Sequence, residues 1–258
     1  MTATLNTCPL QARVNHLHPA PARVMLFVSL LLVLASVICY QSGLDMYLAR
    51  AISSLEGEAG GFPWAHSYWL DDVLHEGGRG LVKRLFFVNL ALLLASYYFK
   101  PLQTWRRALL YIAIATVAST SIVSILKHLT TLPCPIVLAE FGGSRNWVSL
   151  GQIFSPELPA GRCYPAGHAS AGYAWLCVAF LFPFGTRKFY LGLAPGLLLG
   201  LVFGICQQFR GYHFMSHDFA TVAVCWTTSG LLAHTLAVTG AANARTRQMT
   251  ITLEEASR

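Results

Sequence analysis

The chain has 258 residues, of which 55% are hydrophobic and only 11% charged, and its mean hydropathy is +0.52. Soluble domains carry roughly 25% charged residues, so this composition excludes an ordinary soluble enzyme, a disordered protein and a nucleic-acid-binding protein. The net charge of +7 indicates no polyanionic partner, because the basic residues are spread over several loops rather than gathered on one face. The sequence therefore predicts a membrane protein.

Long runs without charge predict where the chain crosses the bilayer, since a spanning helix needs about 20 mostly apolar residues. Four runs qualify by length, and two shorter runs complete a set of six. The predicted spans are residues 24–44, 85–99, 108–126, 169–186, 189–209 and a stretch that starts at Phe219. The expected fold is therefore all-α, a polytopic six-transmembrane-helix bundle over residues 24–240, with an N-terminal tail at 1–23 and a C-terminal tail at 241–258.

The distribution of Lys and Arg predicts the orientation of this bundle, because short loops rich in these residues stay in the cytoplasm. The side that holds both termini carries ten of the eighteen Lys and Arg residues but only two of the eleven acids. We therefore expect both termini in the cytoplasm and the protein in a bacterial-type inner membrane. The outer, periplasmic loops are then 45–84, 127–168 and 210–218.

Two of the seven cysteines, Cys134 and Cys163, fall in the outer loops of this topology. Thiols in an oxidising compartment tend to pair. We expect a disulfide between them, the alternative being two free thiols.

Charged and polar side chains gather at the outer ends of the last four spans. They are Lys127, Arg145, Arg162, His168, Arg210, His213, His217 and Asp218. Several cations together with helix N-terminal amides bind phosphate or another oxyanion. One histidine can attack phosphorus if a neighbour holds its far nitrogen, and another can protonate the leaving oxygen. This scheme requires no metal and no cofactor.

These residues fall into three motifs that resemble the signatures of the type-2 phosphatidic acid phosphatase superfamily. The family patterns are K-x6-R-P, P-S-G-H and S-R-x5-H-x3-D. The corresponding segments here are 127–135, 165–168 and 210–218. The resemblance implies a helical membrane bundle with its site at the outer surface, and hydrolysis of a phosphomonoester or pyrophosphate through a phosphohistidine.

The chain departs from this pattern at four positions. Cys134 replaces the first-motif Arg, Ala166 replaces the Ser of the second motif, Gln207 stands at the third-motif Arg position, and His217 stands at the Asp position. Each missing cation has a nearby substitute, and so does the aspartate. Arg210 lies one helical turn after Gln207, Asp218 follows His217, and Arg145 or Arg162 can replace the first-motif Arg.

Carried over residue by residue, the resemblance implies a role for each group. His213 is the expected nucleophile, positioned by His217 or Asp218, and His168 protonates the leaving oxygen. The expected phosphate-binding residues are Lys127, Arg210, Gly167 and one of Arg145 or Arg162. Phe141-Gly142-Gly143 and the paired cysteines also resemble a lipid A phosphatase branch, and the implied partners are a lipid phosphate and the bilayer.

Three other functions use the same residues. A lipid phosphotransferase passes the phosphoryl group to a second lipid, and an inactive relative only binds lipid. A zinc-dependent hydrolase would use His213 and His217, completed by His168 or Asp218. Four other histidines are interpreted as structural or packing residues: His66, His75, His128 and His234.

Overall fold

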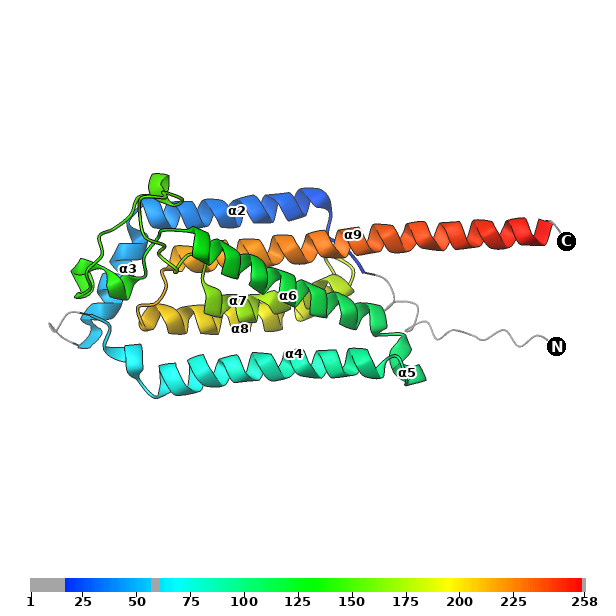
Figure 1. Ribbon diagram of the computed structural model, residues 1–258, viewed down its shortest axis with the longest axis horizontal. Helices are drawn as coiled ribbons and strands as arrows, with labels where there is room; N and C mark the ends of the chain where they lie inside the picture. The colour runs from blue at the N-terminus through cyan, green and yellow to red at the C-terminus, as the bar shows by residue number, and fades with distance from the viewer. Residues whose placement is uncertain (1–16, 57–60, 257–258) are drawn as a thin grey trace.

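The computed structural model describes residues 17–56 and 61–256, and its helices run roughly along one long axis (Figure 1). Residues 1–16 of the expected N-terminal tail and the last two residues of the C-terminal tail lie outside this range. The α-helices are α2 (Ala22–Gln41), α3 (Leu44–Ser53), α4 (Gly78–Ala95), α5 (Lys100–Gln103), α6 (Arg106–Leu129), α7 (Gly167–Tyr173), α8 (Arg187–Phe209) and α9 (Met215–Ala256).

Shorter helical segments occupy the connections. They are the π-helix η3 (Trp69–Gly77) and the 3-10 segments η1 (Ser54–Glu56), η2 (Pro63–His66), η4 (Pro135–Val137), η5 (Ala139–Phe141), η6 (Leu150–Gln152) and η7 (Ala174–Leu181). Apart from one isolated bridge between Leu138 and Arg145, the regular structure of the described residues is helical. The all-α prediction is confirmed.

Within the described ranges, four helices are long and apolar enough to cross a membrane: α2, α6, α8 and the Met215–Thr239 part of α9. Two of the six predicted spans are not in this group. The predicted span 85–99 overlaps α4, which begins earlier, ends at Ala95 and carries three basic residues in its first half. The predicted span 169–186 is shorter than expected, because α7 and η7 together end at Leu181.

Both of these helices still have nearly the length of a span. The 18 residues of α4 rise about 27 Å, at roughly 1.5 Å per residue. The seven residues of α7 and the eight of η7 rise about 26 Å together, because a 3-10 helix gains about 2 Å per residue. A hydrocarbon core is about 30 Å thick, so η7 gains length by winding more tightly.

Close packing around α8 sets the distance between the helices that carry the polar groups. Four buried glycines recur on α8 at every fourth position, from Gly192 to Gly204. A Cβ on Gly196 would overlap the backbone of η7, and one on Gly200 would overlap the ring of Tyr173. Small residues at this spacing let membrane helices approach closely, so α7 and η7 lie directly against α8.

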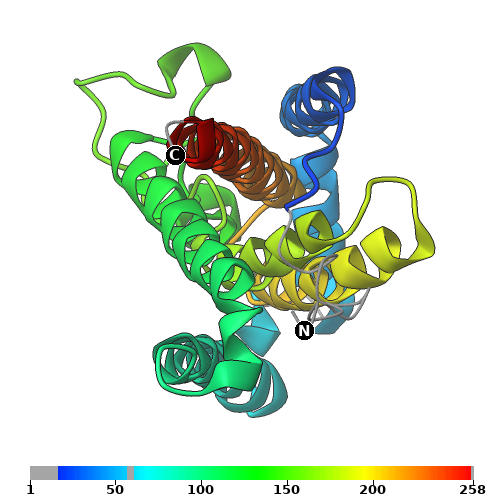
Figure 2. The ribbon, with the colours of Figure 1, turned by 90° about the vertical axis from the view of Figure 1, so that its right-hand side faces the viewer.

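The view along the long axis shows α9 beside both α2 and α6, with α4 on the outer side of α6 (Figure 2). The segments 45–56, 61–77, 130–166 and 210–214 lie at one end of the bundle, and α5 and the far end of α9 lie at the other (Figure 1). Asp45 of α3 ties this end together, since its buried carboxylate accepts a hydrogen bond from the Ser216 backbone N–H, 3.0 Å away, at the start of α9.

Candidate functional site

His213 lies in the short turn between α8 and α9. Gly211 takes a positive φ of 74°, which a glycine adopts without strain. The chain then folds back so that the carbonyl of Gln207 accepts hydrogen bonds from the backbone N–H groups of Tyr212 and His213, at 2.8 and 3.3 Å. Gln207 stands where the family pattern has arginine, and its main chain holds the turn. His213 is thereby fixed at the end of the bundle with only 5% of its surface exposed.

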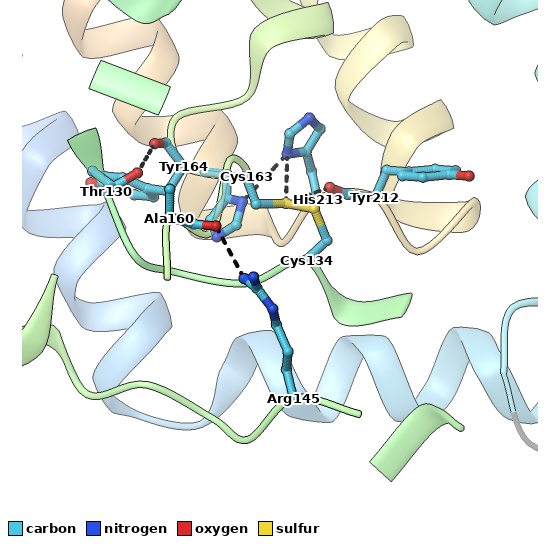
Figure 3. Close-up of a disulfide and its surroundings, with 9 residues drawn as sticks. Thr130, Cys134, Arg145, Ala160, Cys163, Tyr164, Tyr212 and His213 are labelled. Carbon is cyan, nitrogen blue, oxygen red and sulfur yellow. Dashed lines mark hydrogen bonds between the residues drawn. A yellow bond between two sulfur atoms is a disulfide. The ribbon is translucent and has the colours of Figure 1, made fainter. Parts of the chain in front are cut away.

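Two groups face the Nδ1 atom of His213 (Figure 3). The Nδ1 atom of His217 is 3.4 Å away and the Sγ atom of Cys163 is 3.6 Å away. Burial lowers the pKa of His213 well below its ordinary value, and the neighbouring His217 and Lys127 lower it further. The imidazole is therefore neutral at pH 7, and its Nε2 atom is the nitrogen left for a substrate.

Cys163 is joined to Cys134 in a disulfide, with the two Cα atoms 5.3 Å apart. The predicted pairing is confirmed. The bond ties the segment after α6 to the segment before α7, so both flank His213 (Figure 3).

The disulfide bears on the zinc alternative. Cys163, His213 and His217 place one potential metal ligand atom each within 4.8 Å of one another. A zinc site needs the thiolate of cysteine, and in the disulfide the sulfur of Cys163 has no thiolate form. Asp218 does not complete the set, because its carboxylate faces α8 instead.

Asp218 lies on the other side of α9 from the His213 contact. Its Oδ2 atom accepts a hydrogen bond from Nε2 of Gln208, 2.6 Å away, and a Cβ on Gly204 would overlap its carboxylate. The sequence left open whether His217 or Asp218 supports His213. In the structure His217 makes the contact with His213, and Asp218 joins α9 to α8.

His168 is the second residue of α7, after Gly167. The helix start is fixed by Thr221 of α9, whose hydroxyl accepts a hydrogen bond from the Ala166 N–H at 2.8 Å. The His168 ring packs against Phe203, with 4.8 Å between centroids, and its buried Nε2 atom has no hydrogen-bond partner among the described residues. Burial lowers the pKa of His168 to about 4, with further contributions from His75 and Arg210. An unpartnered nitrogen in this position is available to a bound group.

The predicted phosphate-binding residues do not all lie together. Lys127, Arg162 and Gly167 line one pocket of about 510 Å³ between the C-terminal end of α6 and the N-terminal end of α7. A Cβ on Gly167 would lie 3.3 Å from Nζ of Lys127, so the glycine leaves room for the ammonium group. Arg145 lies apart from this group, and its Nη1 donates to the carbonyl of Ala160 at 3.2 Å (Figure 3).

Arg210 is already paired within the protein. Its guanidinium is 95% buried, with Nη2 2.6 Å from Oδ1 of Asp71 and Nε 3.0 Å from the carbonyl of Ala65. These contacts join Arg210 to the 45–84 segment. Its charge still acts on the site, because it contributes to the lowered pKa of His168.

The sequence analysis assigned no function to His75, yet its ring lies 4.5 Å from the ring of His168. Its Nδ1 atom is 3.3 Å from Oδ1 of Asp71, four residues earlier. The i,i+4 spacing of an acid and a histidine in a helical segment was the signal in the sequence. Only the fold places that segment against α7.

An apolar groove of about 440 Å³ lies beside the cationic pocket, between α4, α6 and α7–η7. Thr120 and Ala171 line both. The walls of the groove are mainly apolar, and they include Phe86, Phe87 and Trp175. The cationic pocket therefore has an apolar surface next to it along the side of the bundle.

Comparison with known families gives one match, to the model described as the PAP2 superfamily, over residues 108–239. The match includes all three motifs and the last four predicted spans, and it covers half of the chain. Members of this superfamily are typically metal-independent phosphatases. No curated protein and no solved structure matches the chain.

Proposed function

Because the chain belongs to the PAP2 superfamily, we propose that it hydrolyses a phosphomonoester or pyrophosphate of a membrane lipid. The reaction takes place at the outer face of the cytoplasmic membrane, through a phosphohistidine, and uses no metal. The observation that carries this proposal is the position of the apolar groove beside the cationic pocket, since Thr120 and Ala171 line both. A phosphate at Lys127 can have its hydrocarbon chain between α4 and α6, within the bilayer.

In the proposed first step, Nε2 of His213 attacks phosphorus and the bond to the leaving oxygen breaks. His217 supports this step, because its Nδ1 accepts a hydrogen bond from the Nδ1–H of His213, which stabilises the positive charge that forms on the ring. The negative charge of a bound phosphate favours the charged form of His168, which then gives a proton to the leaving oxygen. Water then attacks the phosphohistidine, His168 accepts a proton from that water, and inorganic phosphate is released.

Lys127 and Arg162 hold the phosphoryl oxygens, since both line the pocket beside Gly167. Charge builds up on those oxygens in the transition state, and fixed cations stabilise it. Arg145 lies on the same loop and is the second candidate for the first-motif arginine. Arg210 acts at longer range, through its charge and through its ion pair with Asp71.

The proposed function assumes that the chain crosses the membrane six times and that the site lies at its outer face. The near-span lengths of α4 and of α7 with η7 support six crossings. The excess of Lys and Arg beside the two termini supports a cytoplasmic position for both ends. The second and third outer loops, with the disulfide, then lie in the periplasm.

Phosphate release by the purified protein in detergent tests the proposed reaction. Phosphatidate, phosphatidylglycerol phosphate, isoprenyl pyrophosphate and lipid A are compared, each beside the His213→Ala variant. We expect release by the wild type and none by the variant. Phosphate release that persists in His213→Ala would overturn the assignment of His213 as the nucleophile. Transfer of the phosphoryl group to another lipid, without free phosphate, would identify a phosphotransferase.

A second variant tests the groove. Val117 lines it and is half exposed, whereas Ile125 lies on the same helix, is 59% exposed and does not line it. We expect Val117→Trp to raise KM for long-chain lipid phosphates and to leave KM for a water-soluble phosphate unchanged. Ile125→Trp is the matched control and should alter neither. If Val117→Trp changes KM by the same factor for long-chain and water-soluble substrates, the groove is not the site of the lipid chain.

A further inference from the structure

The first outer segment supplies an ordered group of charged side chains beside His168. η3 (Trp69–Gly77) packs against α8 and runs directly into α4. Its seventh residue, His75, has 25% of its side chain exposed. The two imidazole rings of His75 and His168 are 4.5 Å apart at their centroids and are tilted by 51°. His75 therefore covers one side of the ring that we assign as the proton donor.

The Nδ1 atom of His75 faces two carboxylates. Nδ1 lies 3.3 Å from Oδ1 of Asp71 and 3.3 Å from Oε1 of Glu76. The same oxygen of Asp71 accepts from the buried Nη2 of Arg210 at 2.6 Å. Because Arg210 fixes the carboxylate, and the carboxylate fixes the imidazole, a continuous chain of contacts runs from the end of α8 through η3 to α7.

Such a chain orients a histidine in the way that a carboxylate orients the base of a hydrolase, by fixing one ring nitrogen and the tautomer. The charged groups around His75 are Asp71 and Glu76 on its own segment, Arg79 at the start of α4, Arg210 after α8, and His168 on α7. His66 of η2 also faces Asp71, at 3.9 Å. Burial and Arg210 lower the pKa of His75.

We propose that His75 is a positioning residue for the reaction: held by Asp71, its ring fixes the imidazole of His168 so that Nε2 of His168 faces the leaving oxygen. The inference rests on the proposed function, in which His168 protonates that oxygen. Nε2 of His168 is buried and has no partner in the described part of the chain, so the hydrogen bond of His168 to the backbone of Leu74 and the neighbouring rings of His75 and Phe203 decide its direction.

The leaving group distinguishes this role from simple packing. A poor leaving group such as a lipid alkoxide needs its proton from His168, whereas p-nitrophenolate leaves without one. If His75 acts through His168, the loss in His75→Asn is large for the lipid phosphate and small for p-nitrophenyl phosphate. If His75 only fills space, both substrates lose the same factor.

We expect His75→Asn to lower kcat on the lipid phosphate by about 30-fold, which is part of the roughly 10²- to 10⁴-fold that general acid catalysis contributes. The loss on p-nitrophenyl phosphate should stay within about threefold. The double variant His75→Asn, His168→Asn should be no slower than His168→Asn alone, because residues that act through each other are not additive. His66→Asn, whose exposed side chain faces the same Asp71, is the matched control and should keep wild-type kcat on both substrates.

His75→Phe keeps the test valid if the Asn variant folds poorly, because it retains the ring contact with His168 but loses the hydrogen bond to Asp71. The same leaving-group dependence is expected for it. Equal losses on both substrates, or additive losses in the double variant, would overturn the proposal. Failure of the proposed function has a different result, in which the wild type releases no phosphate from either substrate or His213→Ala keeps its activity.

Discussion

At the scale of single residues, the charged groups of the site are not at the positions that the family pattern gives them. The pattern has aspartate four residues after the nucleophile, and this chain has His217 there, 3.4 Å from His213. A neutral imidazole can accept the same hydrogen bond as a carboxylate but brings no negative charge. The charges of the site are instead concentrated on Lys127, Arg162 and the Arg210–Asp71 pair.

Substitution of the two adjacent candidates tests which of them supports His213. We expect His217→Asn to lower kcat by about 10²-fold, because it removes the group that holds Nδ1 of the nucleophile. Asp218→Asn should lower kcat by no more than a few-fold, since its carboxylate bonds Gln208 and not His213. Steady-state phosphate release on one lipid measures both, and a larger loss in Asp218→Asn would reverse the two roles.

The buried His213 also makes stability depend on pH. Its pKa is lowered in the folded state, whereas in the unfolded chain a histidine titrates near its ordinary value of about 6.5. Below that value the unfolded state binds the proton that the folded state does not, so stability falls as the pH falls. This single group contributes up to about 2 kcal/mol of loss at pH 5.

Thermal melts at pH 7 and pH 5 measure this effect. We expect the fall in Tm between the two pH values to be smaller in His213→Asn than in the wild type. The exposed His128, replaced by Asn, is the control and should leave the fall unchanged. A fall of equal size in wild type and His213→Asn would contradict a neutral, buried His213.

At the scale of elements, two devices bring the motifs together. The glycines of α8 let α7 and η7 approach closely, which sets His168 opposite the end of α8. The disulfide fixes the loop between α6 and α7 against the turn that carries His213. Lys127, His168 and His213 come from three elements, and these contacts hold them at one end of the bundle.

Removal of the disulfide should therefore affect both stability and turnover. The two cysteines are 29 residues apart, and a closed loop of that size is worth about 3–4 kcal/mol on the chain-entropy model. We expect the double variant Cys134→Ala, Cys163→Ala to melt at a lower temperature and to lose kcat, because Cys163 also contacts His213. A reductant should give the wild type the same properties and leave the double variant unchanged. An unaltered kcat would show that the bond serves stability alone.

At the scale of the whole molecule, the segments that carry the site lie at one end of the bundle and α5 lies at the other (Figure 1). A membrane placed across the helices would separate these two ends. The number of crossings then determines which aqueous compartment each end meets, and an even number puts the two chain ends on the same side.

Labelling with a membrane-impermeant maleimide on intact cells tests the topology, in a background that has Cys8 replaced by Ser. We expect Ser144→Cys, an exposed position of the second outer loop, to react from outside. Gln103→Cys in α5 is exposed too and should react only after the membrane is opened. The opposite pattern would invert the orientation, and labelling of both from outside would contradict a crossing by α6.

The sequence by itself determined the membrane class, the helical fold and the order of the motifs, because composition and charge-free runs are local properties. It also determined the disulfide partners, since only two cysteines fall in the predicted outer loops. The sequence did not determine the lengths of the second and fourth predicted spans. Basic residues within a helix shorten its apolar run, and a change to 3-10 winding increases the rise per residue.

Only the tertiary structure decided which polar groups meet. Arg210 and Asp71 are far apart in sequence, and so are His75 and His168, so no local pattern indicates their contact. Arg210 was expected to bind phosphate, but in the structure it forms an ion pair with Asp71. Likewise, two adjacent residues, His217 and Asp218, point to different neighbours because successive side chains on a helix lie about 100° apart. The sequence named the groups, and helix packing selected their partners.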